Sequence, residues 1–197
     1  MARPLAIWWI KRDARLGDNA CLEEALRRGW ELLPFFCFEP TILAADDTSD
    51  MHVHAQGQAI DGLRTSLRQL GAEIVIAHGE IVEKLAKLRA AVPFSALFSH
   101  EEVGNDLTFR RDRDVAAWCK GHGIEYREFP QSSVRRGGVD RERLSNQWAN
   151  RVASMSPIAV PTIRQADDLR QLAAKTAFPK LKAFAANDPW QAVSEQE

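Results

Sequence analysis

The sequence has few cysteines and no long apolar run, and each lack excludes a class of protein. Cys21, Cys37 and Cys119 are scattered and form no CxxC pair, so neither a disulfide framework nor an iron–sulfur or zinc site is encoded. No segment approaches the roughly 18 apolar residues that a membrane helix needs. The N-terminal apolar run is also too short for a signal peptide. We therefore expect a cytoplasmic protein with no membrane partner.

Net charge and glycine patterns narrow the function further. The formal net charge of −1 gives no general attraction to nucleic acid, so any contact with DNA is expected to be indirect. The motifs GxGxxG, GxxxxGK[ST] and GxSxG are absent from the sequence. Their absence excludes a dinucleotide fingerprint, a P-loop and a hydrolase nucleophile elbow.

Short apolar runs alternate with amphipathic stretches over most of the chain. The runs have the length and composition of buried strands and lie at residues 4–10, 31–38, 72–79, 94–100 and 124–129. Helix-like stretches separate them, at residues 19–30, 51–71, 80–92 and 107–123. In the first of these helices, Leu22, Ala25 and Leu26 are expected to share the inward face. The alternation predicts an α/β fold with a five-stranded, doubly wound parallel sheet of Rossmann-like order 3-2-1-4-5.

The C-terminal part of the chain has a different pattern. The alternation stops near residue 130, and prolines interrupt the remaining sequence. We expect a helix at about 140–153 and another near 163–176. Residues 1–135 would then form the α/β domain, and residues 136–197 a helical and proline-containing extension or linker. Its large apolar residues predict that the extension docks partly on the domain; they are Phe178, Leu181, Phe184 and Trp190.

Charged residues cluster in the turns that follow the first and fourth strands. In the predicted strand order these two turns lie beside the crevice where open parallel sheets bind ligands. The candidate cofactor-binding residues in them are Lys11, Arg12, Asp13, His100, Glu101 and Glu102. Trp8 is expected to be buried against helices. Strand alternation places residues 9, 11 and 13 on one side of the sheet and residues 8, 10 and 12 on the other.

The same residues also have a structural interpretation. Asp13, Arg15 and Asp18 can pair with one another, and Asp18 or Asn19 can cap the first helix. Asn105 or Asp106 can cap the helix that begins near residue 107. A crevice filled by its own charges would then belong to a purely structural or interaction protein.

Other polar clusters are weaker candidates for a site. His52 and His54 have no neighbouring ligand to complete a metal site and are interpreted as a solvated helix start. The run FRRDRD at residues 109–114 is interpreted as a salt-bridged, solvated helix face. The arginine-rich stretch at residues 134–143 is the best local candidate for an anion or nucleic-acid contact.

The two charged turns, with the segments around them, resemble the DNA photolyase/cryptochrome family. Members of that family run from the first strand into a turn of the form WFRRDLRLxDN. Residues 7–26, IWWIKRDARLGDNACLEEAL, match that form in order at Trp9, Lys11-Arg12-Asp13, Arg15-Leu16 and Asp18-Asn19. Residues 97–136 resemble the family's fourth strand, next helix and fifth strand, with Gln131 and Val134 in the turn beyond. Residues 144–152, LSNQWANRV, resemble the short helix after that turn, so the resemblance covers roughly residues 4–153.

The resemblance implies the family's N-terminal α/β domain, which often holds an antenna chromophore such as a deazaflavin or a reduced folate. The antenna passes excitation energy to FAD, which lies in a C-terminal helical domain that we expect to be missing from this chain. The activity implied is that of a deoxyribodipyrimidine photolyase, a lyase of light-driven DNA repair, or of a blue-light sensor. We expect no catalytic residues in this chain and no repair by it alone.

The resemblance also bears on partners and on the choice of chromophore. The expected partner is a helical FAD-binding domain or a separate chain. Folate-binding members usually carry an asparagine–glutamate pair where this sequence has Phe109 and Arg110, which argues against the usual mode of folate binding. The alternative function is a stand-alone nucleotide or small-molecule binding module of the same architecture.

Overall fold

A central parallel sheet organises the computed structural model, which describes residues 3–131, 145–146, 149–150, 153 and 163–176. Its strands are β1 (Leu5–Ile10), β2 (Glu31–Phe38), β3 (Val75–His78), β4 (Ala96–His100) and β5 (Glu125–Phe129). They lie in the order β3-β2-β1-β4-β5, and every neighbouring pair is parallel. The predicted fold class and strand order are confirmed.

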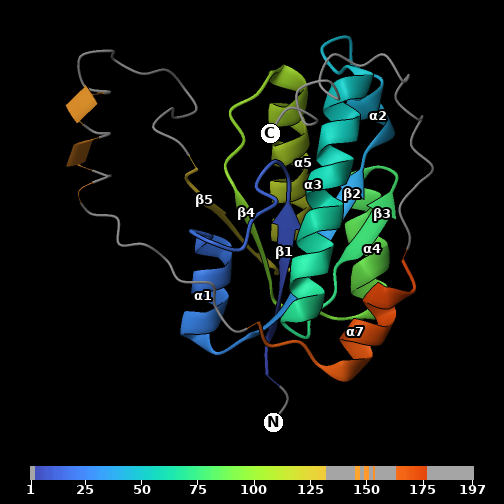
Figure 1. The fold of residues 1–197 in the computed structure, drawn as a ribbon, viewed down its shortest axis with the longest axis vertical. Coiled ribbons are helices and arrows are strands. Elements are labelled where there is room, and N and C mark those ends of the chain that lie inside the picture. The colour runs from blue at the N-terminus through green and yellow to red at the C-terminus, as the bar shows by residue number, and fades with distance from the viewer. Residues whose placement is uncertain (1–2, 132–144, 147–148, 151–152, 154–162, 177–197) are drawn as a thin grey trace, which may run out of the picture.

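Helices cover both faces of the sheet (Figure 1). They are α1 (Ala20–Arg28), α2 (Pro40–Leu43), α3 (Asp50–Gln69), α4 (Ile81–Ala91), α5 (Asp106–Gly121) and α7 (Asp167–Ala174). Two apolar clusters show which face each covers: α1 and α3 pack on one, and α4, α5 and α7 on the other. The central strand β1 alternates between them, so Trp8 is buried on the α1 side and Trp9 on the α5 side. The burial of Trp8 is as predicted.

The helix ends and faces agree with the sequence in most places and differ in two. Asn19 caps α1, accepting hydrogen bonds from the backbone of Cys21 and Leu22, and Asn105 caps α5. Leu26 is 41% exposed, so its expected inward position is wrong. The buried residues of α1 are 21, 22, 24 and 25, and at 100° per residue position 26 lies beyond the edge of this face and turns toward solvent. The short helix α2 lies where no helix was expected, in the connection after β2.

The extension contributes a docked segment at the β3 edge. Helix α7 buries Leu169 and Ala173 against the α4 and α5 side of the sheet. The Gln165 amide pairs with the Glu73 backbone in both directions, at 2.7 and 2.9 Å. The Thr176 hydroxyl accepts from the backbone N–H of Ile76 at 3.0 Å. The helix predicted near residues 163–176 is therefore confirmed, and this part of the extension is docked.

Several predictions fall outside the described residues. These are the arginine-rich stretch at residues 134–143 and the apolar residues Phe178, Leu181, Phe184 and Trp190. The helix expected at about 140–153 lies mostly outside them as well; residues 145–146, 149–150 and 153, which are described, are helical. Where the structure describes the chain, no helix is both long and apolar enough to cross a membrane. The division into residues 1–135 and 136–197 stays a prediction.

Docking of α7 can be tested by truncating its buried leucine. Leu169 is 4% exposed, so Leu169→Ala should lower the free energy of unfolding by about 2–5 kcal/mol, as expected for a buried leucine. The matched control is Leu26→Ala, the same truncation on an exposed helical position, which should cost within about 0.5 kcal/mol. Urea unfolding measures both. Equal losses in the two variants would show that α7 does not pack on the sheet.

Candidate functional site

A cavity of about 400 Å³ opens at the carboxyl ends of β1 and β2, a volume suited to a small molecule. It lies between the first half of α3 and the start of α5. Its apolar wall includes Trp9, Phe36, Phe38, Ile42, Leu43 and Val53. Its polar lining includes Arg12, Glu39, Gln56, Glu102 and Arg111. An apolar pocket with a few convergent polar groups is the usual form of a small-molecule site.

The cavity lies beside the expected crevice and not in it. Sequence reasoning placed the crevice between the first and fourth strands, whereas the cavity is lined by β1, β2 and the segment that joins β2 to α3. Residues after β4 contribute only one wall, which includes Glu102. The β2–α3 segment was missed because no helix was expected between residues 38 and 51, although proline is common at the first position of a helix, as Pro40 is here.

Three of the six predicted site residues line the cavity, and three do not. Lys11, Arg12 and Glu102 line the cavity. Asp13 and His100 do not line it and form a buried pair instead. Glu101 is half-buried, lies outside the cavity lining and donates its backbone N–H to the Phe129 carbonyl. Ligand binding by these residues stays a prediction.

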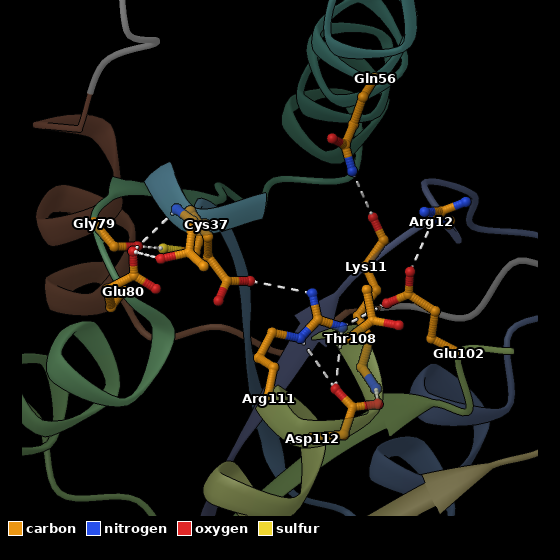
Figure 2. A network of polar contacts seen from close by, with 12 residues as sticks. Lys11, Arg12, Cys37, Gln56, Gly79, Glu80, Glu102, Thr108, Arg111 and Asp112 are labelled. Carbon is orange, nitrogen blue, oxygen red and sulfur yellow. Dashed lines mark hydrogen bonds and ion pairs between the residues drawn. The ribbon is translucent and has the colours of Figure 1, made fainter. Parts of the chain in front are cut away.

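The Lys11 side chain is enclosed although its backbone borders the cavity. Its ammonium group bonds Asp112 at 2.8 Å and Glu128 at 3.1 Å, and the side chain is 2% exposed. The same ammonium lies 4.5 Å from the centroid of the Trp9 ring. Figure 2 shows Gln56 of α3 pointing down to the Lys11 backbone carbonyl, to which it donates at 3.0 Å. Lys11 is therefore part of the cavity wall, and its ammonium group is already paired with carboxylates.

Arg111 is the centre of the polar network beside the cavity (Figure 2). Its guanidinium donates to Glu39 at 3.2 Å, to Glu102 at 2.5 Å and to Asp112 at 3.0 Å. It also lies 5.0 Å from the centroid of the Trp9 ring, so this indole has cations from two elements close to it. Burial opposes its charge, but the surrounding carboxylates raise the pKa of Arg111.

This network corrects the interpretation of residues 109–114 as a solvated helix face. Asp112 is fully buried and Arg111 is mostly buried, because both point from α5 toward the end of β1. The helical spacing of Arg111, Val115 and Trp118 placed that arginine on the inward side of the helix, which was the available signal. Arg12 lies at the opposite end of the network, 69% exposed at its side chain and 2.8 Å from Glu102.

Asp13 fixes the turn after β1 from the other side of the sheet. Its carboxylate accepts from the Trp8 indole at 3.3 Å and from the Lys11 backbone at 3.0 Å, and it lies 2.5 Å from Nδ1 of His100. Burial alone would raise the pKa of Asp13, but the hydrogen bond and charge of His100 outweigh it, and the pKa is lowered. The carboxylate is therefore ionised near neutral pH.

One expectation about this turn is wrong. Asp13 was expected on the side of residues 9 and 11, and it contacts Trp8 on the other side because regular alternation ends with β1. The contacts of Arg15 with its neighbours in the turn involve the backbone. The Arg15 guanidinium donates to the Asp18 backbone carbonyl, and the Arg15 backbone N–H donates to the Asp13 carbonyl.

Cys21, His100 and Asp13 lie together without forming a nucleophilic triad. Both the Cys21 sulfur, at 3.6 Å, and the Asp13 carboxylate approach the same ring nitrogen, Nδ1 of His100. A triad needs the two partners on opposite ring nitrogens. Burial, and then the charge of Asp13, raise the pKa of the Cys21 thiol well above its usual value. Over the described part of the chain, no cluster of histidine, cysteine and acidic residues could hold a metal ion.

Comparison with known proteins identifies the family. Residues 6–139 match the family model described as DNA photolyase. The chain belongs to the DNA photolyase family. Its sheet corresponds to the family's N-terminal α/β domain, so the resemblance found in the sequence is confirmed.

The photolyase relatives are longer than this chain. It is 26% identical to a blue-light photoreceptor of Arabidopsis thaliana over 67% of the chain and 30% of the relative. It is 26% identical to a deoxyribodipyrimidine photo-lyase of Synechococcus sp. over 86% of the chain and 36% of the relative. A crystal structure of an archaeal photolyase from Sulfolobus tokodaii superimposes with a TM-score of 0.68 at 22% identity, over 83% of this chain and 39% of that one. The chain therefore spans about a third of the length of these relatives.

Glu39 is a buried acid of this photolyase-family domain whose protonation changes near neutral pH. It stands at the end of β2, lines the cavity and is 5% exposed. Burial raises the pKa of Glu39 to about 7, and the charge of Glu80 adds to the rise, while Arg111 opposes it. Sequence reasoning missed Glu39 because a single acid after a strand carries no pattern.

Asp13 is expected to carry much of the stability of the turn. Asp13→Ala should lower the free energy of unfolding by about 3–5 kcal/mol, because it leaves the buried His100, the Trp8 indole and a backbone N–H without their acceptor. Because its folded-state pKa is lowered, this contribution is present above the ordinary value near 3.8 and is lost as pH falls through the folded-state value. Glu101→Ala, which truncates a half-buried acid outside the cavity, is the comparison and should cost within about 1 kcal/mol. Chemical denaturation measures the free energy of unfolding of both variants. Similar losses in Asp13→Ala and Glu101→Ala would refute the role of Asp13.

Glu39 is expected to make stability fall as pH rises toward neutrality. An acid whose folded-state pKa is raised binds a proton on folding, so between the ordinary value of 4.5 and about 7 each rise in pH destabilises the folded state. Relative to Glu39→Gln, the wild-type free energy of unfolding should fall by about 3 kcal/mol across this range. Asp46→Asn controls for the loss of one negative charge on the same connection. Parallel pH profiles for wild type and Glu39→Gln would contradict the assignment.

Proposed function

We propose that this chain is the light-gathering half of a photolyase or cryptochrome system and that its cavity holds an antenna chromophore. The observation that carries the proposal is the apolar-walled cavity of about 400 Å³ at the carboxyl ends of β1 and β2. A parallel sheet binds its ligands at this end of the strands. The archaeal photolyase that superimposes on this chain is described as having two FAD molecules, with the implication of a novel light-harvesting cofactor, which supports a chromophore in a domain of this kind.

The cavity suits a planar heteroaromatic ring. Trp9, Phe36 and Phe38 offer apolar surface, and Gln56 and Arg111 supply hydrogen-bonding groups at its edge. A flavin-like or deazaflavin-like ring can use both. A reduced folate in the family's usual mode is less well supported. Phe109 is exposed, Arg110 pairs with Asp106 at 2.7 Å, and neither Phe109 nor Arg110 lines the cavity.

The proposal assigns the chemistry of the system to a partner. FAD, when bound, would supply the photochemical electron transfer, and it would be held by a helical domain on the same or a separate chain. The residues of this chain would bind the antenna, exclude water from it and hold it at a fixed place on the sheet. Contact with DNA would be made by the partner, consistent with the net charge of −1. This chain alone would not repair DNA.

A reconstitution experiment tests chromophore binding. The purified chain is mixed with riboflavin, FMN, FAD, 5-deazariboflavin or methenyltetrahydrofolate, the free ligand is removed, and an absorption spectrum is recorded. We expect retention of a flavin-type ring with a near-ultraviolet or blue band. Ala59→Trp should abolish retention, because Ala59 lines the cavity and the indole would fill it.

The control for Ala59→Trp is a tryptophan placed outside the cavity. Ala117→Trp introduces the same side chain at an exposed position of α5 that is not part of the cavity lining, and retention should be unchanged. Failure to retain any of these chromophores, together with an adenine nucleotide released on denaturation, would favour the alternative of a nucleotide-binding module.

A further inference from the structure

The cations around the cavity are already paired with carboxylates. Its cationic neighbours are Lys11, Arg12 and Arg111. Their carboxylate partners are Glu39, Glu102, Asp112 and Glu128. In the ion pairs of the described residues, these three cations share four acids. A phosphate or another anion entering the cavity would meet carboxylates there and, among these residues, no cation without an acidic partner.

Glu39 is the member of this group with the fewest compensating contacts. Lys11 bonds Asp112 and Glu128, and Arg12 with Arg111 enclose Glu102. Glu39 shares Arg111 with two other acids, at the longest of the three distances, 3.2 Å. Glu39, one of the residues that line the cavity, therefore has the longest of these contacts with Arg111.

The other groups around Glu39 act on its pKa in both directions. From the β3–α4 connection, Glu80 raises its pKa, and the backbone N–H of Ile81 at the start of α4 donates to it. Glu80 itself accepts from the Thr41 hydroxyl at 2.7 Å. Below it on β2, the Cys37 thiol donates to the Gly79 carbonyl at 3.0 Å. From α4, Lys84 is 3.8 Å from Glu83, and its charge opposes the rise in the pKa of the nearby Cys37 thiol.

We propose that Glu39 makes the cavity selective for an uncharged ligand that donates a ring N–H to its carboxylate, and that it selects against phosphorylated forms of the same ring. The inference rests on the proposed function, since it names the class of chromophore that the same cavity takes. A lactam or imide edge supplies such a donor, and a hydrogen bond to a charged acceptor is stronger than one between neutral groups. The donor would complete the coordination of Glu39 that Arg111 shares with other acids.

Uptake of such a ligand depends on the ionisation of Glu39. Only the carboxylate form accepts the N–H, and with a pKa of about 7 this form is the minor one at pH 6 and the major one at pH 8. Because apparent affinity scales with the competent fraction, the ligand should bind roughly tenfold more tightly at pH 8 than at pH 6.

Riboflavin and FMN provide the test, because they share one ring and differ by a phosphate that carries about −1.5 to −2 charges near pH 7. Dissociation constants of both are measured on the full chain by quenching of flavin fluorescence. At pH 8 we expect riboflavin to bind at least tenfold more tightly than FMN, and at pH 6 we expect riboflavin to lose about tenfold. In Glu39→Gln, which keeps the shape of the side chain, the pH dependence for riboflavin should disappear and the preference over FMN at pH 8 should shrink. Asp46→Asn removes an exposed charge nearby and should behave as wild type.

Different results would overturn the selectivity of the cavity and the binding of a chromophore. FMN binding as tight as riboflavin binding in the wild type overturns the selectivity and leaves chromophore binding standing. A pH dependence that survives in Glu39→Gln removes Glu39 as its cause. If neither flavin binds the wild type at either pH, chromophore binding of the flavin type fails, and the selectivity fails with it.

Discussion

The hydrogen bond between Asp13 and His100, 2.5 Å long, joins residues that are 87 positions apart in the chain. Both are buried at the carboxyl ends of the two central strands, β1 and β4. Because Asp13 also binds the Trp8 indole and the Lys11 backbone, the chain cannot leave β1 in any other direction without losing several buried contacts at once. The position of every charged residue in the first turn depends on this constraint.

The hydrogen bonds of Asp13 also determine where the charged side chains lie on the opposite side of the sheet. With the turn fixed, Lys11 is directed down onto Asp112 of α5, and Arg12 is directed outward to Glu102. Burying such ions costs desolvation energy, which well-placed partners offset only in part. The residual cost falls on Glu39, whose pKa is raised to about 7. A network that holds one buried acid with a raised pKa is weak evidence for stability and better evidence for a binding site.

Sequence reasoning succeeded where the signal is local. The strands themselves, the burial of Trp8 and caps at one of two adjacent residues all follow from short patterns of apolar residues and capping side chains. Strand order followed from the alternation of strands and helices, which is typical of one common fold class. It failed where the answer depends on contacts between distant segments. Nothing near Asp13 in the chain shows that its partner is His100, and alternation misplaced it because the strand ends at Ile10.

The same limit explains the two residues that were missed at the site. Glu39 gains its properties from Arg111 and Glu80, which come from other elements, and from its own burial at the start of a short helix that the sequence did not predict. Arg111 lies on the inward face of α5, but the alternating charges around it resemble those of a solvated helix. Sequence reasoning placed the candidate site at the carboxyl ends of the strands, and half of the residues that it predicted there line the cavity, which lies beside the expected crevice.

The pairing of Gln165 and Thr176 with the outer side of β3 has a consequence for how the chain folds. These contacts join residues 92 and 100 positions apart, and β3 is an edge strand of the sheet. During synthesis, the backbone groups of Glu73 and Ile76 emerge before their partners. At about 5–20 residues per second, this delay is on the order of 5–20 s. Throughout this interval the strand presents hydrogen-bonding groups that another chain can pair with. Until residues 165–176 have been synthesised, this edge of the sheet therefore stays open to pairing with another chain.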